Sequence, residues 1–338
     1  TLSADDLGSL PDVSMADALT RLPGISAVRT GGQAGEINIR GMAGGFVFTT
    51  LNGREQVSPS GSRSIEFDQY PSELISAAAV YKSPKSSLIE GGVAGTVELK
   101  TASPLMNRED HKLSMNLRGM VNDRADEVSD AEKFGHRFSV SYQGKFADDT
   151  IGFAAGYARL YQPSVATQFV GLAYNGEKDL DLDGTSEFIS EGFELQHKGG
   201  EETRDGMMAV LEWQPNDALS LKADVYYSKF DTEAFARGFR VKTLQNGTII
   251  NPVVTDDGAM IGGTVNRVGN DSFLVQTTND DNTDYDEVLS AGLNLTWFKG
   301  PWTLSADLST SEAESDFVNG VAWGLLFEDA SADSPVVE

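Results

Sequence analysis

The acidic run that begins at Asp179 is the one local motif in this chain with the residue types to hold a metal ion. Asp179, Asp181 and Asp183 alternate with leucines, and a glycine follows them. Carboxylate oxygens that converge around a tight turn are typical of the start of a calcium loop. Ser190 stands where such a loop would place its bidentate glutamate. The run therefore predicts either a calcium site in an outer loop or a solvated acidic loop, and no other cofactor is expected.

Catalytic chemistry has little support in the sequence. The three histidines, His111, His136 and His197, are far apart, and the chain has no cysteine. Neither a nucleophile elbow nor a zinc-protease helix motif occurs. We therefore expect scattered surface histidines and predict that the chain is not an enzyme.

Aromatic residues are frequent in the segments that we expect to be long loops. Phe235 and Phe239 are the candidates for contact with a ligand. Flat rings with carboxylates and amides nearby suit a sugar, because they offer stacking and hydrogen bonds to hydroxyl groups. The same rings equally suit packing within the loops themselves.

Composition limits the classes of partner. The formal net charge of −25 argues against nucleic acid, whose phosphates an acidic surface would repel. A hydrophobic content of 40% is enough for a packed core, and 338 residues favour two structural units. No apolar run approaches the roughly 18 residues of a membrane helix, which leaves a β-barrel open.

Apolar and polar residues alternate along seven segments of the C-terminal part, as expected for strands with one apolar face. These segments cover residues 113–121, 138–146, 151–157, 207–213, 219–227, 289–297 and 302–309.

The lengths of the links between these segments separate a barrel from a soluble sandwich. The links at residues 147–149, 214–218 and 299–301 are short, whereas those at 161–206 and 232–284 are long. Strict alternation of short and long links is typical of outer-membrane barrels. Tryptophans beside the short turns would form an aromatic girdle at the lipid interface. Since plugged barrels use about 22 strands, seven would be the N-terminal portion of a longer receptor.

The N-terminal part is predicted to form a small α/β unit. Ser14 is placed to cap a helix that runs to Leu22, with Asp17 at the capping-box position. Short extended runs are expected at residues 36–40, 46–51, 77–81 and 95–101. Asn52 and Gly53 predict a hairpin turn after the second run.

Four motifs in this part carry a resemblance when taken together. They are Leu22-Pro23-Gly24-Ile25, Ile37-Asn38-Ile39-Arg40-Gly41, Leu51-Asn52-Gly53-Arg54-Glu55 and Glu90-Gly91-Gly92-Val93-Ala94-Gly95-Thr96-Val97. In this order they resemble the plug domain of TonB-dependent outer-membrane receptors. The last motif looks closest to a branch that is often associated with carbohydrates.

The resemblance implies a fold and a set of partners. Residues 1–104 would form the plug, and residues 105–338 would supply the first antiparallel transmembrane strands of an incomplete β-barrel. The plug would fill the barrel lumen in the bacterial outer membrane and respond to a TonB-type energy-coupling protein. Its apical loops would meet an extracellular ligand, which makes Ser60 and Arg63 candidate binding residues. No convincing coupling box precedes Leu22.

Opposite charges on the plug and on the strands predict contacts between them. The plug motifs carry Arg40, Arg54 and Glu90, and the polar faces of the strands carry Arg118, Glu212, Asp224 and Asp307. In a watery lumen each such pair should be modest, about 0.2–1 kcal/mol.

The function predicted from the sequence is energy-coupled uptake of a scarce nutrient, an oligosaccharide or related glycan. One alternative is a ferric-siderophore or vitamin receptor of the same fold. From a different class, the alternative is a secreted β-rich binding protein with no transport role.

Overall fold

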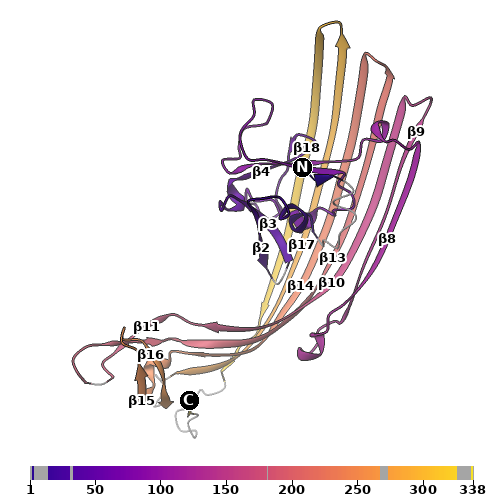
Figure 1. Cartoon of the computed structure of the whole chain (residues 1–338). Helices are drawn as coiled ribbons and strands as arrows, with labels where there is room; N and C mark the ends of the chain where they lie inside the picture. The colour runs from indigo at the N-terminus through magenta and orange to yellow at the C-terminus, as the bar shows by residue number, and fades with distance from the viewer. Residues whose placement is uncertain are drawn as a thin grey trace.

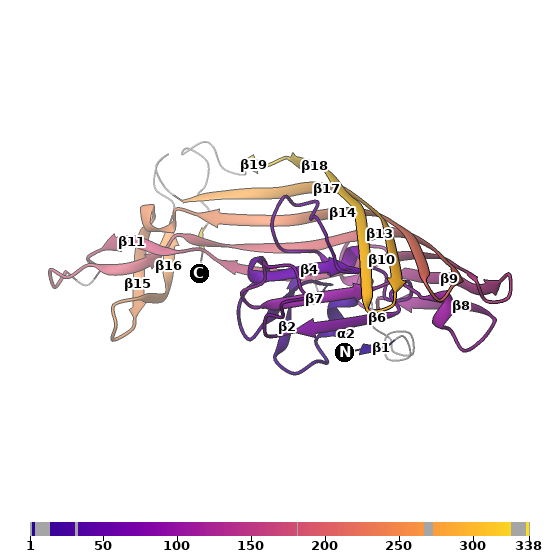
Figure 2. The ribbon, with the colours of Figure 1, turned by 90° about the horizontal axis from the view of Figure 1, so that it is seen from above.

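A computed structural model describes residues 2–3, 14–30, 33–180, 182–266, 273–325 and 336–337. It consists of a small N-terminal domain and a long antiparallel sheet, called the wall here, that curves around one side of that domain (Figure 1). Seen from above, the domain lies against the inner face of the wall (Figure 2). Among the described residues, no helix is long and apolar enough to cross a membrane.

The N-terminal domain is built on a mixed sheet. Its strand order is β1(Leu2–Ser3), β6(Ala77–Tyr81), β7(Gly95–Lys100), β4(Val47–Leu51) and β5(Arg54–Glu55). Strands β4 and β7 are parallel, and the other pairs are antiparallel. Three further elements complete it: the hairpin β2(Ile25–Thr30)–β3(Gln33–Ile39), the helix α2(Met15–Leu19), and the 3-10 turns η1(Gly44–Phe46) and η2(Phe67–Gln69).

Local sequence accounts for two of these features. The hydroxyl of Ser14 accepts the backbone N–H of Asp17 at 3.3 Å and so caps α2, as predicted. The α-helix ends at Leu19 rather than Leu22, because the N–H groups of Arg21 and Leu22 bond to carbonyls three residues back and Pro23 follows. Asn52 and Gly53 both have positive φ, which is the geometry of the predicted hairpin turn between β4 and β5.

The wall contains the seven predicted strands, each neighbouring the next along the chain. They are β8(His111–Val121), β9(Phe134–Phe146), β10(Ile151–Gly171), β13(Gly192–Asn216), β14(Leu219–Lys242), β17(Leu274–Lys299) and β18(Trp302–Val321). The linker from the N-terminal domain contains η3(Pro104–Met106), and η4(Ala125–Glu127) lies between β8 and β9. The two-residue strand β19(Gly324–Leu325) also pairs with β17.

The central strands are much longer than the sequence predicted. Strand β10 pairs with β13 from Ile151 to Gly171 without a break, and β14 pairs with β17 as far as Lys242. The apolar alternation stops before the strands do, because backbone hydrogen bonding continues where the outward side chains become polar. The two regions expected to be long loops are therefore mostly strand, and that expectation is wrong.

Only residues 172–191 and 243–273 link these strands, and both links are partly folded. They contain β11(Tyr174–Lys178), β12(Glu187–Ser190), η5(Leu244–Asn246), β15(Thr248–Val254) and β16(Met260–Asn266), with β20(Val336–Val337) pairing against β16. We call this group of hairpins the lobe, and the opposite end of the wall the short-turn end. A small apolar cluster around Val241, Val265 and Phe273 packs the lobe.

The two faces of the wall differ in chemistry. On β14, Asp224, Tyr226 and Ser228 face the N-terminal domain, whereas Ala223, Val225 and Tyr227 alternate with them and face outward. The continuous register carries this alternation across the sheet, so that one band is outward and apolar. Its members include Leu113, Met115, Phe153, Leu211, Leu221, Leu293, Leu295 and Leu308.

Polar pairs and tryptophans border this band. On the lobe side, Arg159 pairs with Asp205 at 2.7 Å and Lys229 with Asp231 at 3.3 Å. At the short-turn end, Trp213 and Trp302 are 42% and 70% exposed. The band is thus limited on both sides, as in a wall that faces lipid.

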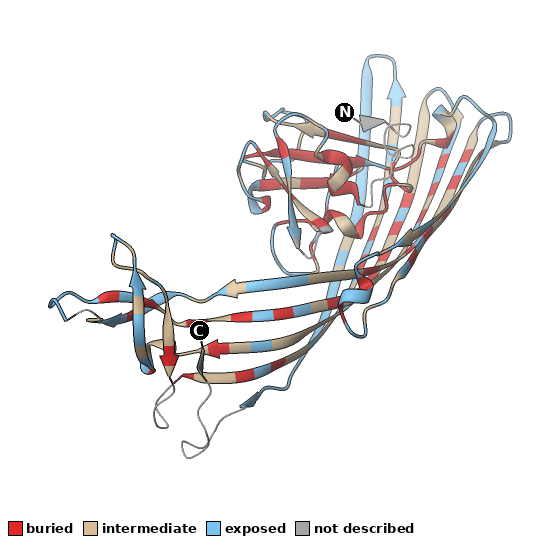
Figure 3. Ribbon diagram, turned by 60° about the horizontal axis from the view of Figure 1, so that its bottom comes forward, coloured by how far each residue is buried: buried red, intermediate tan, exposed pale blue. Residues whose placement is uncertain are grey.

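The core is shared between the two parts of the molecule. One apolar cluster joins Met15, Leu19, Ile37 and Leu99 of the N-terminal domain to a group of wall residues that comprises Ala154, Ala158, Met208, Val210 and Tyr226. Buried residues concentrate in the domain and on the wall positions behind it (Figure 3). The domain is therefore packed onto the wall rather than tethered beside it.

Candidate functional site: the interface between the N-terminal domain and the wall

Arg54 joins the domain to two wall strands near the short-turn end. Its Nη1 donates to Asp224 Oδ2 at 2.6 Å, and its Nε donates to Asp307 Oδ1 at 2.8 Å. Burial lowers the pKa of Arg54, but hydrogen bonds to Asp307 and Asp224 outweigh that effect, and the pKa is raised overall. Asn52 also donates to Asp224, at 3.0 Å. The hairpin turn therefore presents two adjacent donors to two wall carboxylates.

Glycines on the inner face of the wall make this close approach possible. A Cβ at Gly292 would lie 1.9 Å from Nη1 of Arg54, and one at Gly206 would lie 2.5 Å from Cγ of Pro71. At Gly156 a Cβ would lie 2.6 Å from Cδ2 of Leu74. A larger residue at these positions would force the side chains of Arg54, Pro71 and Leu74 to move, so the glycines leave room for the domain on the inner face.

Uncharged polar groups join the two parts in the middle of the interface. The hydroxyl of Ser290 donates to Gln56 Oε1 at 2.8 Å, and that same oxygen accepts from Tyr70 at 3.2 Å. The backbone carbonyl of Gln69 accepts from the hydroxyls of Tyr226 at 2.5 Å and Ser228 at 2.8 Å. The rings of Tyr70 and Tyr226 stack with centroids 5.0 Å apart.

Nearer the lobe, the interface becomes charged again. Arg204 of β13 is 2% exposed and donates to the backbone carbonyl of Asp68. Burial raises the pKa of the Asp68 carboxyl to about 6, although the positive charge of Arg204 acts in the opposite direction. Glu202 of β13 lies close enough to Asp68 to repel it, and Gln69 donates to Asp286 of β17 at 3.1 Å.

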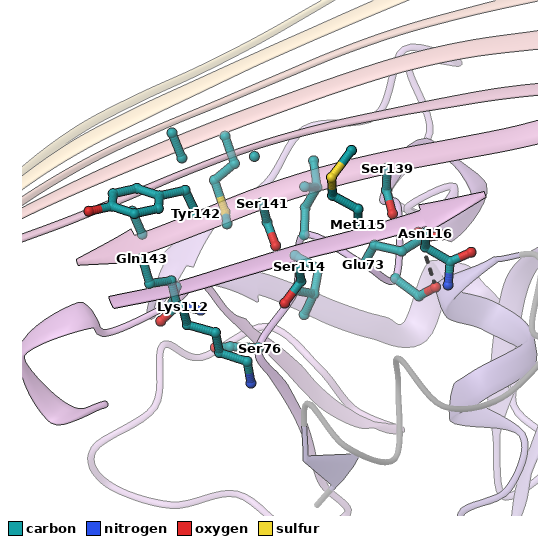
Figure 4. Close-up of a pocket in the computed structure, with 18 residues that line it drawn as sticks. Glu73, Ser76, Lys112, Ser114, Met115, Asn116, Ser139, Ser141, Tyr142 and Gln143 are labelled. Carbon is teal, nitrogen blue, oxygen red and sulfur yellow. Dashed lines mark hydrogen bonds between the residues drawn. The ribbon is translucent and has the colours of Figure 1, made fainter. Parts of the chain in front are cut away.

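A cavity of about 530 Å3 separates the domain from β8, β9 and β10. Figure 4 shows its lining, with Ser114, Ser139 and Ser141 on the wall strands and Glu73 and Ser76 on the domain. Arg137 of β9 pairs with Glu73 and donates to Ser72 at 3.2 Å beside this cavity. Among the described residues, Arg137 and Glu73 form the ion pair on this side, and serine hydroxyls, apolar side chains and Lys112 line the remaining space.

The predicted apical loop is held together by one carboxylate. The hydroxyls of Ser58 and Ser60 both donate to Glu66 Oε1, at 2.9 and 2.6 Å. Arg63 is exposed and lines a hollow of about 450 Å3 on the domain together with Glu90. Ser60 and Arg63 thus lie on one loop, but Ser60 is directed at Glu66.

The predicted charge contacts separate into those that reach the wall and those that do not. Arg54 meets Asp224 and Asp307, while Glu212 accepts from Ser103 at 2.7 Å and from the backbone N–H of Leu105 at 3.0 Å. Glu212 therefore anchors the linker rather than an arginine of the domain.

Arg40 and Glu90 were expected to contact the wall, and that expectation is wrong for the strands described. Both side chains are exposed, and no ion pair or side-chain hydrogen bond joins either one to a described wall residue. The backbone N–H of Arg40 donates to the carbonyl of Gly24, and its positive φ continues the turn into Gly41. The Arg40 motif thus shapes a turn of the domain.

Phe235 and Phe239 were expected in a loop over the domain, and this placement is also wrong. Both lie in β14 with the same parity as Val225, so they face away from the domain. The ring of Phe235 covers Gly199, where a Cβ would lie 2.3 Å from it, and Arg237 lies 5.0 Å from the ring centroid. The ring of Phe239 meets that of Phe193 edge-on with centroids 6.1 Å apart.

The calcium loop stays a prediction. Asp181 lies outside the described residues, while Asp179 and Asp183 accept the backbone N–H groups of Gly184 at 3.1 Å and Thr185 at 2.7 Å. Within the described part of the chain, no three His, Asp or Glu side chains lie together in a way that could hold a metal ion. Each of the two placed aspartates closes its own turn.

Sequence reasoning missed Asp68, Gln69, Arg204 and Asp286. Asp68 and Gln69 lie in η2, between recognised motifs. Arg204 lies in a segment interpreted as a loop, and Asp286 lies between such a segment and the start of the apolar alternation on its strand. The alternation of side chains between the two faces of a strand was an available signal. Extending it along β14 past Tyr227 would have identified the residues that face inward as far as the lobe.

Comparison with known proteins bears on the N-terminal domain. Residues 1–97 match the family model described as the TonB-dependent Receptor Plug Domain. Curated proteins gave no match. The N-terminal domain is a plug domain of this type, followed by antiparallel strands of an incomplete barrel, and we call it the plug below.

Several solved structures resemble the whole chain at a low level. They include the ferric enterobactin receptor PfeA in complex with BCV-L6 (TM-score 0.39, 10% identity, 95% of this chain and 59% of that chain). The siderophore receptor PirA from Acinetobacter baumannii gives a TM-score of 0.40 with 12% identity over 97% of this chain and 59% of that chain. The ferric citrate transporter FecA in the unliganded form gives a TM-score of 0.42 with 12% identity over 96% and 58%. The chain spans about 59% of the length of the first of these structures, and likeness at this level carries no information on the ligand.

Proposed function

We propose that this chain is the plug and the first wall strands of a TonB-dependent receptor that takes up a scarce nutrient across the bacterial outer membrane. In this proposal the apolar band of the wall faces lipid, the short-turn end faces the periplasm, and the lobe faces the exterior. A TonB-type protein would supply energy by acting on the plug.

The contact between the Arg54 hairpin and the inner face of the wall is the observation that carries the proposal. Arg54 fits against Gly292 and binds Asp224 and Asp307, so plug and wall are complementary in both shape and charge. A secreted binding protein has no need for an outward apolar band whose members, such as Leu113 and Leu308, are 66% and 72% exposed. The band favours the receptor over that alternative.

Release of the plug would depend on breaking the same contacts. The Arg54 pairs are near the short-turn end, where force from a periplasmic protein would arrive first. The cavity beside β8, β9 and β10 lies on the side where Arg137 and Glu73 make the ion pair. We therefore propose that the plug yields first on that side, where uncharged hydroxyl groups line the gap.

The ligand belongs to one of two classes in this proposal. An oligosaccharide or related glycan is the first, and a ferric siderophore or a vitamin is the second.

The test is uptake by cells that express the full-length receptor. Labelled ligand should accumulate only when the energy-coupling protein is present, and Arg54→Lys should slow uptake while leaving binding at the cell surface intact. The lysine keeps the charge but cannot bind both carboxylates in the same forked geometry. Equal accumulation with and without the coupling protein would refute the proposal.

A further inference from the structure

The linker between the plug and β8, residues 101–110, crosses the inner face of the wall near the short-turn end. Counting from the plug, it meets Lys222 of β14, Glu212 of β13, Gly152 of β10 and Lys145 of β9. At Gly152 a Cβ would lie 2.8 Å from Cγ of Leu105, so the linker packs directly against the sheet there. The linker thus touches the wall strand by strand on its way from β14 to β8.

The wall residues that meet the linker form one row across the sheet. In the register of the strands each is directly opposite the next, in the order Lys145, Gly152, Glu212 and Lys222. Residues directly opposite in antiparallel strands point to the same face of a sheet. Asp224, two residues beyond Lys222 on β14, binds Arg54 of the plug. The row that carries the linker is therefore next to the contact that holds the Arg54 hairpin.

Glu212 binds the linker with both oxygens of its carboxylate. Oε1 accepts from the hydroxyl of Ser103 at 2.7 Å, and Oε2 accepts from the backbone N–H of Leu105 at 3.0 Å. Lys222 Nζ lies 3.5 Å from Oε1 of Glu212 and donates to the carbonyl of Ala102 at 3.4 Å. Glu212 is 8% exposed, so water competes little for these bonds. We call Glu212 and Lys222 the linker clamp.

The partners of the linker change from plug to wall between Thr101 and Ala102. The backbone N–H of Thr101 donates to Asn52 Oδ1 at 3.1 Å, and its carbonyl accepts from the hydroxyl of Ser76 at 2.6 Å. From Ala102 to Leu105, the bonds to Glu212 and Lys222 run to the wall. The plug can therefore move at Thr101 without first breaking the contacts of the linker clamp.

We propose that Glu212 and Lys222 are positioning residues that keep the linker on the wall when the plug is displaced, so that the moving part of the chain ends at Ala102. The inference rests on the proposed function, because a coupling protein would displace the plug, and it adds the point at which that displacement stops. Without the clamp the linker would peel away as far as β8. Residues 103–110 would then add roughly 26–29 Å of tether, at 3.3–3.6 Å per extended residue. A longer tether lowers the effective concentration of the plug at its seat, so the clamp also favours its return.

The experiment pulls on the plug of the full-length receptor in a lipid bilayer, through a handle at the N-terminus and at constant force. Release and unfolding of the plug should come first. A separate last step, roughly 26–29 Å long, should follow when residues 103–110 leave the wall. Absence of a separate last step in the unchanged receptor would overturn the inference.

Two variants assign the last step to the clamp. Glu212→Gln keeps the side-chain shape but loses the charge and one acceptor oxygen, and Lys222→Met loses the bond to Ala102. Each should shorten the waiting time before the last step on the order of tenfold and leave the waiting time before plug release unchanged. A merely structural role would shorten both waiting times, and that result would overturn the inference.

Glu201→Gln is the matched control, because it removes the same charge from the outer face of the same strand, where Glu201 accepts from Tyr161. Both waiting times should stay unchanged in this variant. A last step that is equally slow in Glu212→Gln, Lys222→Met and Glu201→Gln would overturn the inference. The measurement needs neither a ligand nor a coupling protein, so its failure is distinct from that of the uptake test, which alone decides the proposed function.

Discussion

Arg54 at the short-turn end of the interface binds two carboxylates, whereas at the lobe end several carboxylates share Arg204. At the first place the wall supplies Asp224, Asp307 and the space above Gly292, and each charge has a partner. At the second, Glu66, Asp68 and Gln69 keep oxygens without donors. The same plug therefore meets the same wall with two different kinds of contact.

The two ends of the interface therefore differ in how completely their polar groups are paired. A buried ion pair with complete hydrogen bonds fixes one geometry, because every alternative leaves a charge unpaired. A surface with spare acceptors is unstable by itself and gains from an added donor. The plug is therefore held by complete charge pairs near the short-turn end, and its contacts are less complete near the lobe.

Removing the Arg54 guanidinium is the change that should disturb this comparison most. In Arg54→Met, Asp224 stays buried without its cation, so docking of the plug should lose about 3–5 kcal/mol. Limited proteolysis of the plug in increasing urea would measure the loss. The double variant Arg54→Met/Asp224→Asn should recover part of it, and a double variant as weak as the single one would contradict the pairing.

The outer face of the wall gives the next effect. Val225→Arg, near the middle of the apolar band, should hinder membrane assembly by roughly 2–4 kcal/mol. The matched control is Ser305→Arg on the inner face, which should be tolerated there. Heat-modifiable mobility on gels reports assembly, and equal losses for the two arginines would show that the faces are not distinguished. Asp224→Asn is no neutral control, because that carboxylate binds Arg54 and Asn52.

The lobe end of the plug–wall interface, where Asp68 is buried, should respond to pH, and the short-turn end should not. Burial raises the pKa of Asp68 from 3.8 to about 6 in the docked plug. Between these values the released plug loses the Asp68 proton before the docked plug does, so the contribution of Asp68 to docking falls as pH rises from about 4 to about 6 and is constant above that. The expected change is roughly 1–3 kcal/mol. Asp68→Asn should reduce the pH dependence of urea-induced plug release between about pH 4 and about pH 6, and an unchanged profile would contradict the assignment.

Arg40 should give the smallest effect. Its side chain is exposed and reaches no described wall residue, so Arg40→Ala should change plug docking by less than about 0.5 kcal/mol. The same urea and protease assay measures it beside Arg54→Met. A loss as large as that of Arg54→Met would show that Arg40 is also a wall contact.

The sequence predicted the fold well where a short-range pattern exists. Alternation located all seven wall strands, and Ser14 and Asn52-Gly53 located a helix start and a turn. It failed for strand length, because Arg159, Asp205 and Lys229 extend the strands beyond the apolar band with polar outward residues. A hydrophobic pattern indicates which residues are buried or face lipid. It does not show where backbone pairing continues among polar, water-exposed side chains.

The site was predictable only in part for a related reason. Arg54 and Asp224 could be grouped, since one lies in a plug motif and the other on a polar strand face. Which plug arginine reaches the wall depends on tertiary packing: Arg54 and Arg40 look alike in sequence, but only Arg54 fits over Gly292. The contacts at the lobe end join residues more than 130 positions apart, such as Asp68 and Arg204, and no local signal connects them.

Lipid accessibility along β17 tests the central claim, a wall between lipid and a plug-filled lumen, most directly. Single cysteines can carry spin labels without background, because the chain has no cysteine of its own. In the full-length receptor in bilayers, labels at Leu289, Ala291, Leu293 and Leu295 should collide freely with oxygen dissolved in lipid. Labels at Ser290, Asn294 and Thr296 should be protected from it. The account predicts this alternation at every second residue, and equal accessibility at neighbouring positions would contradict it.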